Sequence, residues 1–372
     1  MLIGVPKEIK VHEYRAGLTP ASVGEFVAHG HEVIVETNTG IGIGSSDEDY
    51  RQAGAEIVGA AAEVFARADM VVKVKEPQPA ERKMLRENQV LFTYLHLAPD
   101  PAQTKDLVES GAVCIAYETV TDGKGGLPLL APMSQVAGRL SIQAGAVALE
   151  RAHGGSGILL GGVPGVPPAK VVVIGGGVVG ENAIEMAHGM AAEVVVLDRN
   201  VDVLSRLSHR FGPALKTVYS TRAAVEQYVL EADLVVGAVL VAGASAPKLV
   251  SADQVRRMKP GSVLVDVAID QGGCFETSRA TTHQEPTYLV DEVVHYCVAN
   301  MPGAVPRTST YALNNVTLPF GLALADKGYR QALLENPNFL KGLNVHKGRV
   351  TYDAVAQDLH YDYVDPAKAL GA

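Results

Sequence analysis

The sequence predicts an α/β protein made of two doubly wound parallel-sheet domains, one of them inserted into the other. Three observations support this fold. Short runs rich in Val and Ile alternate with helix-compatible segments over most of the chain, which is typical of parallel sheets with helices between the strands. A glycine-rich segment, 175–180, directly follows one of these runs. The alternation ends after Asn300, where Pro302, Gly303 and Pro306 break the chain.

The domain boundaries follow from the chain length and from this late change of pattern. A chain of 372 residues is long for a single core, so two domains are expected. The C-terminal stretch is too short and too broken to build a core of its own, so we expect it to pack on the N-terminal domain. We therefore predict a discontinuous domain of 1–130 plus 308–372 around an inserted domain of 131–307. Two long helices, near 134–153 and 308–325, would join them.

The first 130 residues alternate strand-like and helix-like patterns but contain no glycine fingerprint of their own. We therefore do not expect a dinucleotide site in this domain. The expected strands are Leu2–Val5, Glu32–Glu36, Met70–Val74, Val90–Leu95 and Val113–Tyr117, with helical stretches such as Pro20–His29, Asp47–Ala53 and Pro101–Ser110 between them.

The inserted domain is organised around a strand, a glycine-rich turn and a helix. Four β-branched residues, Val171–Ile174, read as a strand buried on both faces. Gly175, Gly177 and Gly180 then follow in G-x-G-x-x-G spacing. The first glycine allows a tight turn, the second lets the backbone approach a pyrophosphate, and the third lets the helix pack closely on the sheet. This order of elements predicts a Rossmann dinucleotide-binding domain, the alternative being a tight turn without a ligand.

An acidic residue identifies the expected dinucleotide. Asp198 ends the next strand, Val194–Leu197, 23 residues after Gly175, close to the spacing at which a carboxylate receives ribose hydroxyls. A carboxylate there would repel a 2′-phosphate, so NAD is favoured over NADP, although the neighbouring Arg199 keeps NADP open. Further strands are expected at Thr217–Tyr219, Leu234–Val239, Val263–Val267 and His295–Val298, which completes six.

Composition excludes several other classes of function. The net charge of −9 argues against nucleic acid or an anionic membrane as a partner. The longest apolar candidate, Leu234–Pro247, is shorter than the ~18 residues of a membrane helix, and the N-terminus does not read as a signal peptide. Three cysteines without metal-ligand spacing indicate a reduced, cytoplasmic protein, and the 11 scattered histidines predict no metal site.

Four reactive side chains follow predicted strands. Arg15 lies in the loop after the first strand, and Lys75, His96 and Asp270 come at or just past the ends of later ones. Because ligands of open α/β sheets bind beyond the carboxyl ends of strands, we expect these groups to meet in a cleft between the domains, beside the nicotinamide. Each residue also has a purely structural reading: a solvated charge, a charge that protects a sheet edge, a core histidine, or a cap of a turn.

The same segments resemble a known family. The opening GVPKEIKVHEYRAGLTP is similar to the N-terminal signature shared by alanine dehydrogenases and the nucleotide-binding subunit of proton-translocating transhydrogenase. The resemblance extends over essentially the whole chain, through KVKEP, YLHLAP, APMSQVAGR, VDVAIDQGGCFETS and VANMPGAVPRTST. The last two segments resemble alanine dehydrogenase more than transhydrogenase. Arg15-Ala16-Gly17 stands where many relatives have Arg-Val-Ala, and His12 stands where Asn is common.

The resemblance implies an L-alanine dehydrogenase that converts L-alanine, NAD and water reversibly to pyruvate, ammonia and NADH. By the same resemblance Arg15 and Lys75 would bind the substrate, His96 would be the acid/base, Asp270 a second catalytic group, and the protein a homohexamer. The cofactor contacts that the fingerprint and the resemblance together predict are Ser134, Gly175, Gly177, Val178, Val179, Gly180, Asp198, Ser220, Val239, Asp270, Asn300 and Met301. The alternatives are a transhydrogenase subunit, another amino acid dehydrogenase such as a saccharopine dehydrogenase, and a non-catalytic NAD sensor.

Overall fold

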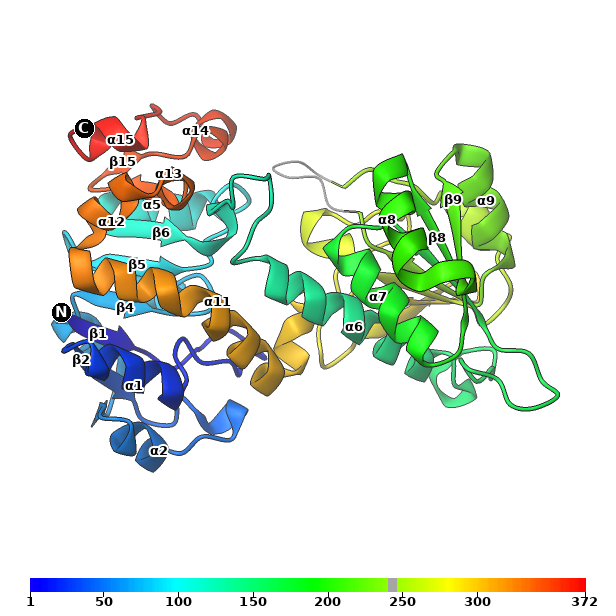
Figure 1. Cartoon of the computed structure of the whole chain (residues 1–372), viewed down its shortest axis with the longest axis horizontal. Helices are drawn as coiled ribbons and strands as arrows, with labels where there is room; N and C mark the ends of the chain where they lie inside the picture. The colour runs from blue at the N-terminus through cyan, green and yellow to red at the C-terminus, as the bar shows by residue number, and fades with distance from the viewer. Residues whose placement is uncertain (240–245) are drawn as a thin grey trace. The chain divides into compact units, whose positions relative to one another are not determined.

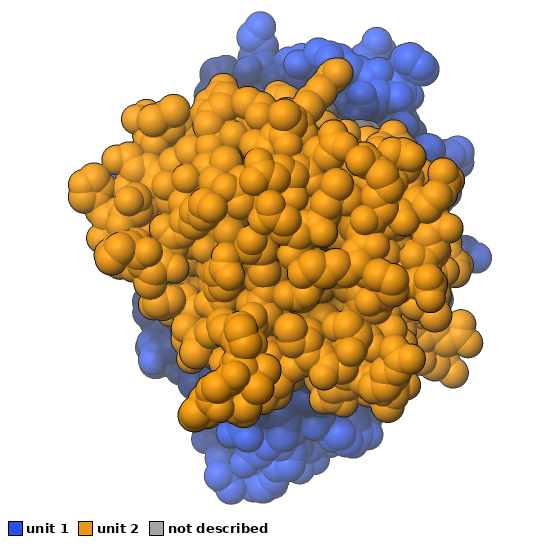
Figure 2. Space-filling model, turned by 90° about the vertical axis from the view of Figure 1, so that its right-hand side faces the viewer, with its two compact units in different colours: residues 1–133, 305–372 blue, residues 134–304 orange. Residues whose placement is uncertain are grey.

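The structure is a computed structural model and describes residues 1–239 and 246–372. The chain forms two compact units, coloured separately in Figure 2: unit 1 contains 1–133 and 305–372, and unit 2 contains 134–304. The chain passes from unit 1 to unit 2 inside helix α6 (Ala131–Ala148) and returns just before α11 (Pro306–Lys327). Each unit has a mostly parallel sheet with helices between its strands (Figure 1). The predicted fold class is confirmed.

Unit 1 is built on an eight-stranded sheet in the order β15-β14-β6-β5-β4-β1-β2-β3. Six neighbouring strands, β6, β5, β4, β1, β2 and β3, run parallel to one another. The order in which the chain adds strands to the sheet reverses between β1 and β4. The strands are β1 (Leu2–Val5), β2 (Glu32–Glu36), β3 (Glu56–Val58), β4 (Met70–Val72), β5 (Val90–Thr93), β6 (Val113–Ala116), β14 (Leu343–His346) and β15 (Arg349–Val350). The helices are α1 (Pro20–Ala28), α2 (Asp47–Gln52), α3 (Ala61–Arg67), α4 (Pro79–Arg82), α5 (Pro101–Glu109), α11, α12 (Tyr329–Glu335), α13 (Pro337–Leu340), α14 (Asp353–Leu359) and α15 (Pro366–Ala369).

The C-terminal stretch completes this sheet. Strand β14 pairs antiparallel with β6, with Val345 opposite Cys114, and β15 adds a further antiparallel edge. Val345, Val350 and Val355 belong to the same buried cluster as Leu91 of the central strand β5. In Figure 1 the orange and red C-terminal elements lie beside the cyan strands β5 and β6. The tail is therefore part of the core of unit 1.

Unit 2 is built on seven strands, counted over its described residues, in the order β12-β13-β11-β10-β7-β8-β9. Only the edge strand β12 runs antiparallel, and the order reverses between β7 and β10. The strands are β7 (Lys170–Ile174), β8 (Glu193–Asp198), β9 (Leu215–Tyr219), β10 (Leu234–Gly237), β11 (Val263–Asp266), β12 (Thr287–Val290) and β13 (Val293–Tyr296). The described helices are α6, α7 (Val178–Gly189), α8 (Val201–Phe211), α9 (Arg222–Glu231) and α10 (Ala252–Arg256).

The differences from the predicted elements lie mainly at element ends and sheet edges. The predicted strands Met70–Val74, Val90–Leu95 and Leu234–Val239 each run two residues too far, because the chain leaves the sheet before the apolar run stops. The edge strands β3, β12 and β15, and β14 next to the edge, were not predicted, since they are short and carry mixed polarity. In the part of the chain that the structure describes, no helix combines the length and the apolar character needed to cross a membrane.

Candidate functional site

The substrate-binding residues expected in unit 1 all follow neighbouring parallel strands. Arg15 comes after β1, Lys75 after β4 and His96 after β5, and Glu118 comes after β6. The carboxyl ends of parallel strands lie at one edge of a sheet, and this edge includes the point where the strand order reverses. The predicted substrate residues of this unit therefore share one sheet edge.

Arg15 is held by a carboxylate that the sequence interpretation missed. Its side chain is buried, and Nε and Nη2 donate to the two oxygens of Glu13 at 2.7 and 2.5 Å. The backbone N–H of Arg15 also donates to Glu13, at 3.1 Å, and Nη1 lies 3.1 Å from the sulfur of Met133. This bidentate pair keeps the planar guanidinium in one orientation and compensates its charge.

Lys75 comes two residues after Lys73, which forms a buried ionic cluster with Glu8 and Glu81. The ammonium of Lys73, which is fully buried, donates to Glu8 at 3.0 Å and to Glu81 at 2.8 Å. The other oxygen of Glu8 accepts the backbone N–H groups of Val74 and Lys75, at 2.7 and 3.2 Å. Burial raises the pKa of Glu8, and Lys73 partly offsets this; burial lowers the pKa of Lys73, but the two carboxylates outweigh it and raise that pKa. The cluster thus fixes the backbone that carries Lys75.

His96 lies at a strained position beside a second missed carboxylate. Its backbone has φ 49°, a left-handed conformation that only a few per cent of non-glycine residues adopt. Glu118 accepts the backbone N–H of His96 at 2.7 Å and that of Leu95 at 3.1 Å, and lies 3.9 Å from His96 Nδ1. The imidazole stacks on Tyr94 at a centroid distance of 5.8 Å, and the Tyr94 hydroxyl donates to the carbonyl of Leu129. The ring is therefore oriented from two sides while 43% of the side chain stays exposed.

In unit 2 the three glycines play distinct roles. Gly175 has φ 101°, and a Cβ there would lie 2.8 Å from the carbonyl oxygen of Ala238. A Cβ on Gly180 would lie 1.8 Å from the carbonyl oxygen of Gly175, so helix α7 could not approach the turn. A Cβ on Gly177 would meet nothing within 4 Å, and no side chain caps the helix that begins at Val178. The backbone N–H groups there are thus available to an anion such as a pyrophosphate.

Three other predicted cofactor residues lie next to this turn. The Asp198 carboxylate accepts the backbone N–H of Gly176 at 2.6 Å and that of Asn200 at 2.7 Å. The carbonyl of Asp198 accepts the N–H of Ser220 at 2.9 Å. Val239, which follows β10, would lie 3.1 Å from a Cβ on Gly175. Val179 is buried and Val178 is exposed at the start of α7.

The remaining predicted residues of unit 2 follow the next strands of the same sheet. Asp270 is exposed on a 3₁₀ turn, Val267–Gln271, after β11. Asn300 and Met301 follow β13, which pairs in parallel with β11, and the carbonyl of Asn300 accepts from His283 at 3.1 Å. Ser134 is half-buried in α6.

The structure thus places most of the predicted residues in two sets, one at the strand ends of each unit, whereas Ser134 lies in helix α6. That both sets line one cleft stays a prediction. The residues missed were carboxylates that hold others in place: Glu8, Glu13, Glu118 and Asp266. Glu8 and Glu118 closely follow predicted strands, and this position was a signal that could have singled them out. Glu13 lies further along the loop after β1, and Asp266 is the last residue of β11, inside the predicted strand Val263–Val267.

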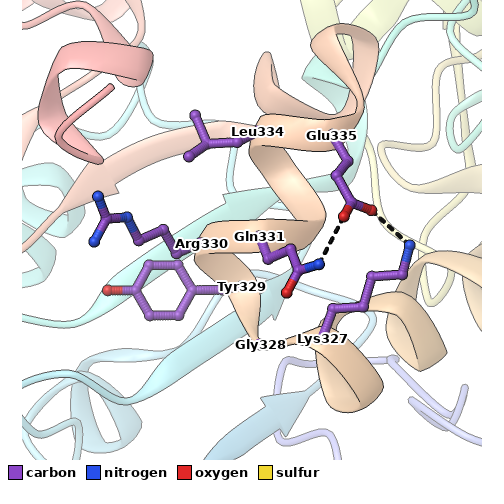
Figure 3. A pocket seen from close by; sticks show the side chains of 7 residues that line it. All are labelled: Lys327, Gly328, Tyr329, Arg330, Gln331, Leu334 and Glu335. Carbon is purple, nitrogen blue, oxygen red and sulfur yellow. Dashed lines mark hydrogen bonds and ion pairs between the residues drawn. The ribbon is translucent and has the colours of Figure 1, made fainter.

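Two surface hollows lie elsewhere in unit 1. The larger, about 550 Å³, is lined by residues around the turn from α11 to α12 (Figure 3). There Glu335 accepts from Lys327 and Gln331 at 2.6 and 2.7 Å. Neither hollow contains a predicted site residue. Within 1–239 and 246–372, no group of three His, Cys, Asp or Glu residues is arranged to hold a metal ion.

The comparisons with known proteins identify the family. Residues 4–137 match the domain family described as alanine dehydrogenase/PNT, N-terminal domain, and residues 141–353 match its C-terminal domain. The alanine dehydrogenase of Halomonas elongata is 60% identical over 371 residues, and that of Bacillus subtilis is 54% identical; the alignments cover 100% of this chain and 100% and 98% of the relatives.

A solved L-alanine dehydrogenase superposes with a TM-score of 0.94 at 54% identity, covering 97% of this chain and 99% of that one. A transhydrogenase from Sinorhizobium meliloti has the same fold, with a TM-score of 0.81 at 24% identity, over 95% of this chain and 100% of that one. The family resemblance of the sequence is confirmed: this chain belongs to the alanine dehydrogenase/PNT family.

Proposed function

We propose that this protein is an L-alanine dehydrogenase, which converts L-alanine and water to pyruvate and ammonia with reduction of a nicotinamide cofactor, reversibly. The observation that carries this function is the 60% identity to an alanine dehydrogenase over the whole of both chains. The transhydrogenase alternative rests on a likeness at 24% identity, which concerns the fold alone.

We propose NAD as the cofactor. The open space beside Gly177 and the uncapped start of α7 suit a pyrophosphate. The carboxylate of Asp198 is fixed beside the glycine turn by Gly176 and Asn200, where it would accept ribose hydroxyls and repel a 2′-phosphate. Ser220, Val239, Asn300 and Met301 follow other strands at the same edge.

In unit 1, Glu13 holds the guanidinium of Arg15 in one orientation, and this supports a role for Arg15 in binding the carboxylate of alanine or pyruvate. A guanidinium matches a carboxylate through two parallel N–H groups, whereas Lys75 offers a compact charge for the carbonyl oxygen. The discrimination against longer side chains depends on the pocket around the methyl group, so serine, glycine and glyoxylate remain substrates to test.

The bound nicotinamide ring supplies the acceptor for the hydride that leaves the Cα of alanine. The resulting imine of the substrate takes up water, and we assign to His96 the removal of that water's proton and its return to the leaving nitrogen. An imidazole can both accept and return a proton, which is why histidine is the most frequent general acid–base group in enzymes. Asp270 would orient the water or the ammonia and balance the transient positive charge.

One assay tests this function against its rivals. Purified protein should oxidise NADH in the presence of pyruvate and ammonium, and not with 2-oxoglutarate and lysine. Hydride transfer between two nicotinamide nucleotides without any amino acid would instead favour the hypothesis that the protein is a transhydrogenase subunit. Loss of the pyruvate reaction in His96→Ala, with NADH binding retained, would separate catalysis from a mere NAD sensor.

Two further expectations belong to this proposal. The homohexamer is supported by the family resemblance alone and is tested by the mass of the purified protein in solution. A reducing, cytoplasmic location is supported by the three cysteines, Cys114, Cys274 and Cys297, all free and buried.

A further inference from the structure

The loop that carries Asp270 is held by side chains on both of its faces. This loop runs from Val267 to Phe275, leaves the sheet at the end of β11 and places Asp270 on its first turn. A loop outside the sheet has backbone N–H and C=O groups that need other partners. Here two side chains of opposite charge supply several of these partners: a carboxylate accepts from N–H groups, and an ammonium donates to C=O groups.

Asp266 holds the loop from the inside. Its carboxylate is fully buried at the end of β11 and accepts the backbone N–H of Ala268 at 3.1 Å, at the start of the loop. The same carboxylate accepts the N–H groups of Cys274 and Phe275 at 2.9 and 3.3 Å, at the far end, and the hydroxyl of Ser278 at 2.5 Å. One carboxylate therefore closes the loop by joining its two ends.

Lys248 holds the same loop from the outside. Its ammonium donates to the carbonyls of Gly272, Gly273 and Phe275 at 2.6, 2.9 and 3.2 Å. Three carbonyls match the three N–H groups of an ammonium. The neighbouring backbone adds two bonds, from Ala246 to Gln271 at 3.0 Å and from Leu249 to Cys274 at 2.7 Å.

We propose that Lys248 and Asp266 are positioning residues of the reaction: they act through Asp270 by fixing the loop on which it lies. This rests on the proposed role of Asp270 in alanine dehydrogenation. Because a misplacement of about 1 Å can cost about 10²-fold in rate, a group on an exposed turn needs such anchoring. The two residues are complementary, since Asp266 accepts hydrogen bonds from N–H groups of the loop and Lys248 donates hydrogen bonds to its carbonyl groups.

The test uses Lys248→Met, because the buried Asp266 is expected to affect folding as well. The matched control is Lys259→Met, which removes an ammonium bonded at 2.9 Å to Asp233, the residue before β10. We expect kcat for alanine oxidation to fall about tenfold in Lys248→Met, with NADH affinity within about twofold of wild type, and Lys248→Arg to restore most of the loss. Lys259→Met should keep the wild-type kcat.

A double-mutant cycle with Asp270→Asn decides whether Lys248 acts through Asp270. We expect Lys248→Met to add little further loss in that background. A kcat for Lys248→Met within twofold of Lys259→Met, or losses that multiply in the double variant, would overturn the inference. A wild-type protein without alanine dehydrogenase activity would instead overturn the proposed function and leave the structural anchoring as it is.

Discussion

A single oxygen of Glu118 accepts the backbone N–H of His96 at 2.7 Å and lies 3.9 Å from the Nδ1 of the same residue. The carboxylate therefore acts on His96 twice: it stabilises a left-handed backbone with φ 49°, and it places a negative charge beside one ring nitrogen. His96, the proposed acid/base, and Glu118 thus follow the ends of adjacent strands, β5 and β6.

The first prediction separates these two residues. His96→Ala should lower kcat by at least about 10²-fold, because it removes the proton carrier, and should leave NADH binding intact. Glu118→Gln should lower kcat less, about tenfold, and also lower Tm, since the neutral amide lacks the charge that strengthens the bonds from the backbone N–H groups of His96 and Leu95. Steady-state kinetics and thermal denaturation measure both. A nearly wild-type kcat for His96→Ala would remove His96 from the mechanism.

The second prediction compares two glycines of the fingerprint. Gly180→Ala should destabilise unit 2, because its Cβ would lie 1.8 Å from the carbonyl oxygen of Gly175 and the helix would have to move. Gly177→Ala should fold as well as wild type, because its Cβ would meet nothing within 4 Å, yet bind NADH about tenfold more weakly by intruding on the pyrophosphate. Tm and nucleotide titration distinguish the two. Equal NADH affinity of Gly177→Ala and wild type would place the pyrophosphate elsewhere.

The third prediction concerns cofactor choice. Asp198→Ala removes the charge that repels a 2′-phosphate and also the acceptor of the Gly176 N–H at 2.6 Å. The KM for NAD should rise about tenfold, and the preference for NAD over NADP in kcat/KM should fall by a similar factor. Asp202→Ala, an exposed carboxylate in the first turn of α8, is the control. An unaltered preference in Asp198→Ala would move the ribose contact to another residue.

The parts of this molecule that could be predicted from sequence are those with local physical signals. The central strands are continuous apolar runs, and the roles of Gly175, Gly177 and Gly180 follow from their spacing after a strand. Asp198 and Ser220 were predicted at strand ends, and their backbone bond at 2.9 Å puts them beside each other.

The contacts of two supporting carboxylates could not be predicted because their partners are distant in sequence. Glu8 meets Lys73, 65 residues away, and Glu118 meets His96, 22 residues away, only after the parallel strands are paired. Asp266 was predicted only as part of the strand Val263–Val267, and its bonds to Cys274, Phe275 and Ser278 form when the loop closes over it. Likewise β14 reads as a weak strand, since its stability comes from β6, more than 200 residues earlier in the chain.

The fourth prediction tests the substrate clamp. Arg15→Lys keeps the charge but cannot reproduce the fork that pairs with Glu13, so the KM for pyruvate should rise about tenfold or more. Arg67→Lys is the matched control, since Arg67 also forms a two-bond pair with one carboxylate, Glu56, together with a bond to Glu63, but on the surface. Steady-state kinetics with varied pyruvate make the comparison. A KM equal to that of the control would show that Arg15 does not bind the substrate carboxylate.

The last prediction concerns the buried cluster of Glu8, Lys73 and Glu81. Removing Lys73 leaves buried carboxylates without their cation, and such a loss destabilises a protein by about 3–5 kcal/mol. Lys73 lowers the pKa of Glu8 against the effect of burial, so in Lys73→Met that pKa should rise further above its ordinary value. A carboxyl whose pKa is raised on folding favours the folded state when protonated, and this stabilisation is lost as the pH rises through the raised pKa.

Lys73→Met should therefore be most destabilised relative to wild type near pH 8 and recover part of the difference near pH 5. Denaturant unfolding of both proteins over this range measures the difference in stability. The control is Lys105→Met, whose ammonium forms an exposed pair with Glu109 and whose loss should leave the difference independent of pH over the same range. A constant deficit of Lys73→Met from pH 5 to pH 8 would show that the carboxylates of the cluster do not take up a proton when the cation is absent.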